Sequence, residues 1–370
     1  MSKSKKYPFW EPEVGEQEIA LVENVIRSNF LNDGDVTSRF ERELANLLGS
    51  KYVVAVTSGT AAIFCALAAL GINGGDEVIV PDVTFIATAN AVVLAGAKPV
   101  FVDVNPKTMN MDPLCFERAI TRRTEAVIPV HISGRPADMK KILQIAKKNG
   151  IHVVEDAAEA LMSKLYGKCL GTFGELGCFS FTANKIITTG QGGAVATNNP
   201  KFHKRLRELK DQGRPVRGTG GADIHNSIGY NFKFTNLQAA VALGQLKQLP
   251  WRIRKMKEIY DIYKEYFAGV KEVSLFNFNT EDGESPQWID ALVEERDVLY
   301  EYLRSKGIYC RKYWYPLHTQ KPYKQSGKKF PVSARLSKKA LWFPSCFKLT
   351  EKDIKYVCNE IKKFYSRKCS

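Results

Sequence analysis

Between residues 50 and 200, short runs of apolar, often β-branched residues alternate with longer runs that have helical spacing. YVVAV precedes TAAIFCALAALG, and EVIVP precedes IATANAVVLAG. The short runs are continuously apolar, which is typical of strands buried on both faces. The pattern therefore predicts an α/β domain in which helices flank a mostly parallel sheet. In such a sheet, ligands bind at the carboxyl ends of the strands.

The remainder of the 370-residue chain has a different pattern. Residues 235–268 form one long or broken helical stretch, and a strand-like IDALVEE, a helical RDVLYEYLRSKG and a helix after residue 350 follow it. A chain of this length suits one large domain and a smaller one. We expect a large α/β domain over residues 1–250 and a smaller α+β domain over 251–370, with the N-terminal segment packing on the smaller one.

Composition excludes several classes of protein. Hydrophobic residues make up 44% and charged residues 25%, which is ordinary for a soluble globular protein. No apolar run is long enough to span a bilayer and none follows the basic N-terminus, so we expect a cytoplasmic location and no membrane association. The eight cysteines form no Cys-x-x-Cys pair and the five histidines no His-x-x-x-His pair. This spacing predicts neither a disulfide framework nor a metal site.

The net charge of +15 lies mostly in the last 70 residues, which hold 18 basic and 4 acidic side chains. These charges are interleaved with helical apolar positions, as in EKDIKYVCNEIKKFYSRK. This interleaving favours a solvated helix face over attraction of an anionic substrate, and both over nucleic-acid binding. We expect no nucleic-acid partner.

Three junctions in the α/β region carry polar residues where strands end. In VTSGTAAIF a strand leads into a helix whose N-terminus could hold a phosphate, although serine and threonine also serve as ordinary caps. In EDAAEA, Glu155 and Asp156 end a buried strand, where an acid could pair a cation or cap the next helix. In SFTANKIITTGQGG, Lys185 lies before a glycine-rich loop, where a lone lysine is usually solvated.

Together these junctions supply what pyridoxal 5'-phosphate (PLP) requires. A helix N-terminus can hold the phosphate, an aspartate can pair with the pyridine nitrogen, and a lysine can form the Schiff base and move a proton. Burial disfavours the charged form of a lysine. An amine that must be neutral to act therefore has a reason to lie beside a cationic ring and out of bulk water.

Longer motifs extend this interpretation. In order along the chain they are SRFERELANLLGSKYVVAVTSGTAA, GDEVIVPDVTFIATANAV, GAKPVFVDV, EDAAEA, GCFSFTANKIITTGQGG, GYNFKFTNLQAAVALGQL and RKYWYPLHTQ. The chain thereby resembles the DegT/DnrJ/EryC1/StrS sugar-nucleotide aminotransferases, which have the PLP fold type I. Within that group it is most similar to the branch that aminates C4 of a GDP-linked 4-keto-6-deoxyhexose, giving a perosamine-like sugar.

The resemblance implies a role for each matching position. Lys185 would form the Schiff base, and Asp156 would pair with the pyridine nitrogen. The other implied cofactor contacts are Gly59, Thr60 and Ser180 at the phosphate, Phe85 stacked on the ring, Glu159 near its 3-hydroxyl, and Asn231 reaching the phosphate in the other subunit. Arg311 and His318 lie in a segment similar to one that approaches the sugar nucleotide. For these two, an exposed arginine and a structural histidine are equally good interpretations.

The resemblance also implies an activity: transfer of an amino group from L-glutamate to a nucleotide-linked keto sugar, for surface glycans such as an O-antigen, by a homodimer with shared active sites. Three positions depart from the family pattern: Gln191 stands where the family usually has glutamate, Lys233 stands where it usually has arginine, and Asp290 lies in a segment that is normally apolar. The alternatives are amination at C3 or on another nucleotide, a non-catalytic PLP-binding homologue, and a basic nucleic-acid-binding module. A dehydratase branch has histidine at the position of Lys185, so lysine favours transamination.

Overall fold

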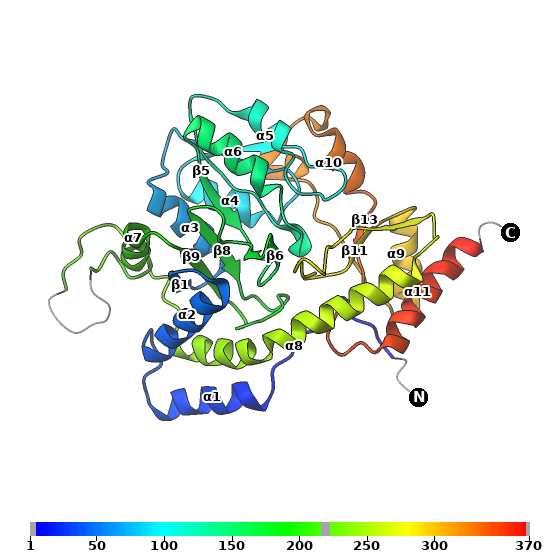
Figure 1. Ribbon diagram of the computed structural model, residues 1–370, viewed down its shortest axis with the longest axis horizontal. Coiled ribbons are helices and arrows are strands. Elements are labelled where there is room, and N and C mark those ends of the chain that lie inside the picture. Colours follow the sequence, from blue (N-terminus) through cyan, green and yellow to red (C-terminus); the bar gives the residue numbers. More distant parts are fainter. Residues whose placement is uncertain (1–4, 216–222, 368–370) are drawn as a thin grey trace.

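The computed structural model describes residues 5–215 and 223–367. A seven-stranded sheet is the larger of two main sheets and lies at the centre of the α/β part of the chain (Figure 1). Its strands, in spatial order, are β1 (Tyr52–Val56), β9 (Gly193–Thr197), β8 (Leu176–Ser180), β5 (His152–Asp156), β4 (Thr124–Val127), β2 (Glu77–Pro81) and β3 (Lys98–Val102). Neighbours from β8 to β3 are parallel, whereas β9 is antiparallel to both β1 and β8. The predicted mostly parallel α/β sheet is confirmed.

Helices connect these strands and cover the sheet. They are α3 (Gly59–Leu70), α4 (Ala87–Leu94), α5 (Pro113–Ala119), α6 (Met139–Asn149) and α7 (Pro200–Lys210). Helix α3 is almost wholly apolar, and residues 61–67 are all buried. Ser58 caps its start by accepting a hydrogen bond from the Ala61 amide, and Gly71 ends it in a left-handed conformation with φ of 84°. The sequence thus fixes the point where the chain turns from β1 into α3.

A second, antiparallel sheet forms after residue 270. Its order is β10 (Val273–Leu275), β11 (Asp290–Val293), β13 (Ala340–Trp342) and β12 (Arg311–Lys312). Helices α9 (Arg296–Ser305), α10 (Pro331–Leu336) and α11 (Glu351–Ser366) accompany it, and a short hairpin of β6 (Lys164–Leu165) and β7 (Lys168–Cys169) completes the strands of the described ranges. The predicted strand in IDALVEE and the two helices that follow are β11, α9 and α11.

Helix α8 (Asn236–Tyr266) joins the two sheets as one 31-residue element that contains Pro250. It packs against α1 (Glu16–Arg27) and α2 (Asp35–Leu48) near one end and against α11 near the other (Figure 1). A domain boundary at residue 250 would fall inside this helix, and the division into 1–250 and 251–370 stays a prediction.

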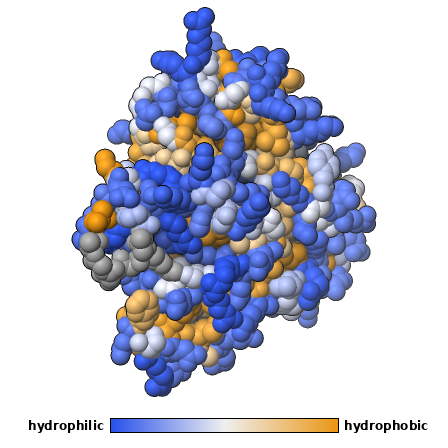
Figure 2. Space-filling model, turned by 60° about the vertical axis from the view of Figure 1, so that its left-hand side comes forward, coloured by the Kyte–Doolittle hydropathy of each residue, from blue (hydrophilic) through white to orange (hydrophobic). Residues whose placement is uncertain are grey.

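The N-terminal segment lies against the part of the chain that carries the second sheet. Tyr7 exchanges backbone hydrogen bonds with Gly307 and Tyr309, both of 2.9 Å, and Lys5 pairs with Asp353 at 2.6 Å. Hydrophilic residues cover most of the face shown in Figure 2, and apolar residues gather in a few patches on it. Within the described ranges, we find no helix with the length and apolar character that a membrane crossing requires.

Candidate active site

A cavity of about 410 Å³ lies where β1, β5 and β8 end, and the segment after β2 and the second sheet close it. Eight of the predicted site residues line it: Gly59, Thr60, Phe85, Asp156, Glu159, Ser180, Lys185 and Arg311. They come from five separate motifs of the sequence, and the fold brings these motifs together. This is the edge of the sheet at which an α/β domain binds its ligands.

The N-terminus of α3 forms one end of the cavity. Ser58, Gly59 and Thr60 lie there beside Ser180 of β8. A side chain at position 59 would place its Cβ 2.8 Å from the Cβ of Ser180, so only glycine allows the helix to begin this close to β8. The first amides of a helix have no intrahelical partner and attract anions. Two serine hydroxyls and these amides therefore form a site suited to a phosphate.

Asp156 presents its carboxylate to the cavity from the end of β5. The Thr88 hydroxyl donates to its Oδ2 at 2.8 Å, and the Ala158 amide donates to its Oδ1 at 3.1 Å. Thr84 and Thr88 share a further hydrogen bond of 3.0 Å between their hydroxyls. The carboxylate is thus held in one orientation rather than used as a helix cap. Thr88 was not among the predicted site residues, although the hydroxyl-rich TFIATAN after β2 was a usable signal.

Lys185 is buried and points its amine toward a carboxylate. Its Nζ lies 3.2 Å from Oε1 of Glu159 and 4.9 Å from the ring centre of Trp288. Burial raises the pKa of the Glu159 carboxyl, although the Lys185 ammonium and the Ser133 amide oppose this effect. The alternative of a solvated loop lysine is wrong for this chain. Trp288 was also missed, because PQWID carries no motif that would distinguish it from a core aromatic residue.

Arg311 and the aromatic residues near it form the outer part of the cavity. Phe85 is 52% exposed, and its ring centre lies 6.4 Å from that of Trp314. Arg311 and Trp314 also line an adjoining hollow of about 400 Å³, together with Tyr300, Lys312 and Tyr315. Cationic and aromatic side chains thus surround the outer hollow, whereas hydroxyls, carboxylates and one amine surround the inner cavity.

Two predicted residues do not line either hollow. His318 is buried, and its Nδ1 lies 2.6 Å from Oδ2 of Asp82, while its ring stacks on Phe330. This geometry favours the structural interpretation of His318. Asn231 is exposed and forms a β-bridge with Asp211. Their binding roles stay predictions.

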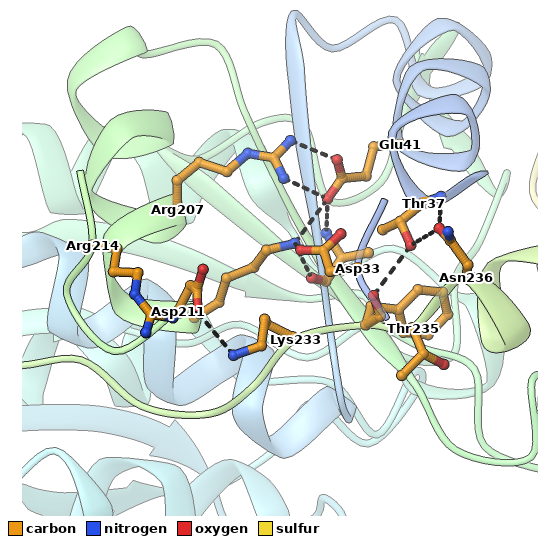
Figure 3. A network of polar contacts seen from close by, with 12 residues as sticks. Asp33, Thr37, Glu41, Arg207, Asp211, Arg214, Lys233, Thr235 and Asn236 are labelled. Carbon is orange, nitrogen blue, oxygen red and sulfur yellow. Dashed lines mark hydrogen bonds and ion pairs between the residues drawn. The ribbon is translucent and has the colours of Figure 1, made fainter. Parts of the chain in front are cut away.

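The departures from the family pattern have distinct surroundings. Gln191 lines the inner cavity. Lys233 does not line this cavity, and its amine forms an ion pair with Asp211 at 2.8 Å (Figure 3). Asp290 is buried and forms an ion pair with Arg135. Within the ranges that the structure describes, His, Cys, Asp and Glu side chains form no group of three or more that could hold a metal ion.

Comparison with known proteins agrees with this geometry. The chain is 37% identical to GDP-perosamine synthase of Escherichia coli O157:H7 over 98% of its own length and 100% of that protein. It is 33% identical to GDP-perosamine synthase of Vibrio cholerae, over 97% and 99% of the two chains. The solved structure of Streptococcus pneumoniae Spr1654 in its PLP form matches with a TM-score of 0.93 and 28% identity, over 98% and 99% of the two chains.

The match to a family covers most of the chain, residues 12–362. It includes every element that lines the cavity, from the start of α3 to the segment that carries Arg311 and Trp314. The chain therefore belongs to the DegT/DnrJ/EryC1/StrS aminotransferase family.

Proposed function

We propose that the protein transfers the amino group of L-glutamate to C4 of a GDP-linked 4-keto-6-deoxyhexose, with PLP as its cofactor. The observation that carries this proposal is the buried amine of Lys185, which lies 3.2 Å from a carboxylate in a cavity that also contains a helix N-terminus and Asp156. Relatives named GDP-perosamine synthase, at 33% and 37% identity, support the choice of substrate.

The residues present fit this cofactor. The space between Gly59 and Ser180 would be filled by a Cβ at position 59, so the cradle for the phosphate depends on glycine. Gly193 has a similar role, because a Cβ there would lie 2.3 Å from the Ser58 carbonyl oxygen. We assign Gly59, Thr60 and Ser180 to the phosphate, Phe85 to a face of the ring, and Asp156 to the pyridine nitrogen.

When bound, PLP supplies an electron sink for the charge left on a substrate carbon after a proton is removed. The protein's own part is to orient groups and move that proton. Lys185 carries the only amine that lines the inner cavity among the described residues, and it would take the proton from one carbon and return it to another. Thr88 holds the Asp156 carboxylate in one orientation at the cavity, where it would pair with the pyridine nitrogen, and Glu159 would hold the Lys185 amine in place between transfers.

The outer hollow would receive the nucleotide part of the substrate. Arg311 and Lys312 offer charge to a diphosphate, and arginine can make paired hydrogen bonds to its oxygens. Tyr300, Trp314 and Tyr315 offer faces on which a base could stack. Amination at C3 or on another nucleotide would use the same inner residues.

The predicted homodimer, cytoplasmic location and role in surface glycan synthesis belong to this proposal. Ile224, Ile228 and Tyr230 are exposed beside Asn231, with Ile228 79% exposed. Exposed apolar side chains in the segment that carries Asn231, a polar residue that lines neither hollow, support a contact with a second copy. Sedimentation of the purified protein tests this point: a single species of monomer mass would contradict it.

Incubation with L-glutamate and a panel of GDP-, dTDP- and UDP-linked 4-keto-6-deoxyhexoses tests the reaction. We expect the GDP sugar to yield an amino sugar and an equal amount of 2-oxoglutarate, as read by mass spectrometry. Exclusive conversion of a dTDP or UDP sugar would overturn the choice of nucleotide. No conversion of any of these sugars by protein with bound PLP would overturn the reaction.

A further inference from the structure

Arg135 and Asp290 form a buried ion pair behind the inner cavity. The guanidinium Nη1 lies 2.6 Å from Oδ1 of Asp290 and Nη2 lies 2.8 Å from Oδ2, so the pair is bidentate. Both residues are 1% exposed, and the guanidinium lies over the ring of Phe276 at 4.6 Å. Tyr313 donates a further hydrogen bond to Asp290. Asp290 is therefore a buried carboxylate with a hydrogen-bond partner at each of its oxygens.

Ser133 links this pair to the cavity. Its hydroxyl donates to Oδ2 of Asp290 at 2.9 Å and accepts from the Trp342 indole at 2.9 Å. Its backbone has the left-handed conformation, with φ of 54°, which is uncommon for a residue other than glycine. In that conformation its amide donates to Oε2 of Glu159 at 2.9 Å. The same carboxylate accepts from Lys185 through its other oxygen.

A second connection runs from the segment before Asp290 to the loop of Lys185. The Gln287 side chain accepts from the Ile186 amide at 3.0 Å, and its backbone amide donates to the Ser133 carbonyl at 2.8 Å. The Trp288 indole donates to the Asn184 carbonyl at 3.2 Å. Both neighbours of Lys185 are thus hydrogen-bonded to the segment that precedes β11.

We propose that Arg135 and Asp290 are positioning residues for the amine of Lys185. The ion pair fixes the Ser133 hydroxyl, Ser133 then keeps the left-handed conformation that directs its amide at Glu159, and Glu159 holds the Lys185 amine toward the cavity. The catalytic part of this inference rests on the proposed aminotransferase function, whereas the placement of Lys185 does not.

The competing explanation is that the pair only stabilises the fold. Replacing a buried ion pair by apolar residues of similar size is often neutral for stability, whereas removing one partner is strongly destabilising. The double variant Arg135→Met/Asp290→Leu therefore separates the two explanations, because it removes both charges together and leaves Ser133 without its acceptor. Glu41→Gln serves as a matched control, since it weakens another buried ion-pair cluster that does not line the cavity.

The main readout uses the full chain freed of cofactor. Brief labelling with acetic anhydride, followed by peptide mass spectrometry, gives the reactivity of Lys185 relative to the exposed Lys324. We expect this ratio to rise about ten-fold in the double variant, as for loss of one charge-assisted hydrogen bond to the amine. In the holoenzyme we expect kcat to fall about ten-fold while the KM for the nucleotide sugar changes by less than about two-fold. Glu41→Gln should lower the melting temperature and leave the labelling ratio unchanged.

Wild-type labelling and wild-type kcat in the folded double variant would overturn the proposal. If that variant does not fold, Ser133→Ala carries the test, because it keeps the ion pair and removes only the hydroxyl that bonds Ser133 to Asp290, while the Ser133 amide that donates to Glu159 remains. An unchanged ratio in Ser133→Ala would likewise contradict the proposal. A raised ratio in a protein whose wild type does not transfer amino groups would support the positioning role and reject the proposed function.

Discussion

Lys185 and Lys210 are both buried lysines, yet their surroundings differ. Lys210, at the end of α7, is 2% exposed, and its Nζ lies 3.0 Å from Asp33, 3.3 Å from Glu41 and 3.1 Å from the Ala55 carbonyl oxygen. An ammonium group has three donors, and here three oxygens lie within 3.3 Å of its nitrogen. Lys185 is 9% exposed and has one acceptor, Glu159, among the described residues, and its amine faces a cavity.

The carboxyls beside the two lysines also differ, because their pKa values are shifted in opposite directions. Burial alone would raise the pKa of Glu41, but Lys210 and Arg207 together outweigh it and hold that pKa below its usual value (Figure 3). At Glu159 burial prevails, and the pKa is raised. The cluster in which three oxygens surround the amine joins α2, α7 and β1. A cluster with an incompletely paired amine beside a cavity has donors left for chemistry. Burial of a lysine alone does not separate scaffold from active site, but the count of its partners does.

Replacing each of the two lysines in turn should give the largest contrast between effects on turnover and effects on stability. Lys185→Ala should lower turnover by about 10⁴-fold, because the proton-moving amine is lost. It should leave the melting temperature nearly unchanged, because the raised pKa allows the buried Glu159 carboxyl to take up a proton when its partner is lost. Steady-state kinetics and thermal unfolding check both points. Near-normal turnover in this variant would contradict the assigned mechanism.

Lys210→Met should have the opposite outcome. It leaves Asp33 and Glu41 buried with less compensation, so the free energy of unfolding should fall by about 3–5 kcal/mol. The folded fraction should keep a kcat within about two-fold of wild type. Urea unfolding and kinetics at low temperature measure the two quantities. Loss of kcat without loss of stability would show that Lys210 is part of the active site.

The dependence of stability on pH should also differ in sign between the clusters. Because the folded-state pKa of Glu41 is lowered, its contribution is present above the ordinary glutamate pKa and is lost as the pH falls, between about pH 5 and pH 3. Because that of Glu159 is raised, its contribution is present at low pH and is lost as the pH rises through the raised value.

Melting temperatures across this range test the sign. The difference between wild type and Glu41→Gln should increase with rising pH, whereas the difference between wild type and Glu159→Gln should decrease. Slopes of the same sign in both series would contradict the distinction between the two carboxyls.

We expect a smaller difference in kcat between variants of two threonines, one at the cavity and one in the scaffold. Thr88→Val removes the hydroxyl that orients Asp156, so kcat should fall about ten-fold. Thr37 donates to the Phe234 carbonyl at 3.2 Å in the scaffold (Figure 3), and Thr37→Val should cost about 1 kcal/mol of stability with kcat unchanged. Kinetics and unfolding of both variants provide the check. Equal effects on kcat would mean that Thr88 has no orienting role.

The sequence predicted much of this molecule where one local pattern decides the structure. The apolar runs predicted the sheet, and the glycine and serine after β1 predicted the start of α3. Lys185 and Asp156 were identifiable because each follows a strand of that sheet. Trp288 and the pairing of Asp290 with Arg135 were not, since they depend on how the second sheet packs against the first. His318 shows the converse: its motif allowed a binding role and a structural role equally, and the contact with Asp82 that favours the structural role was not visible in the sequence.

The most direct test of the account uses borohydride reduction of the purified protein with bound PLP, followed by peptide mapping. The account predicts that absorbance near the visible edge disappears on reduction and that the reduced cofactor remains attached to the peptide containing Lys185. Attachment at Lys210 or another lysine, or no attachment at all, would contradict it.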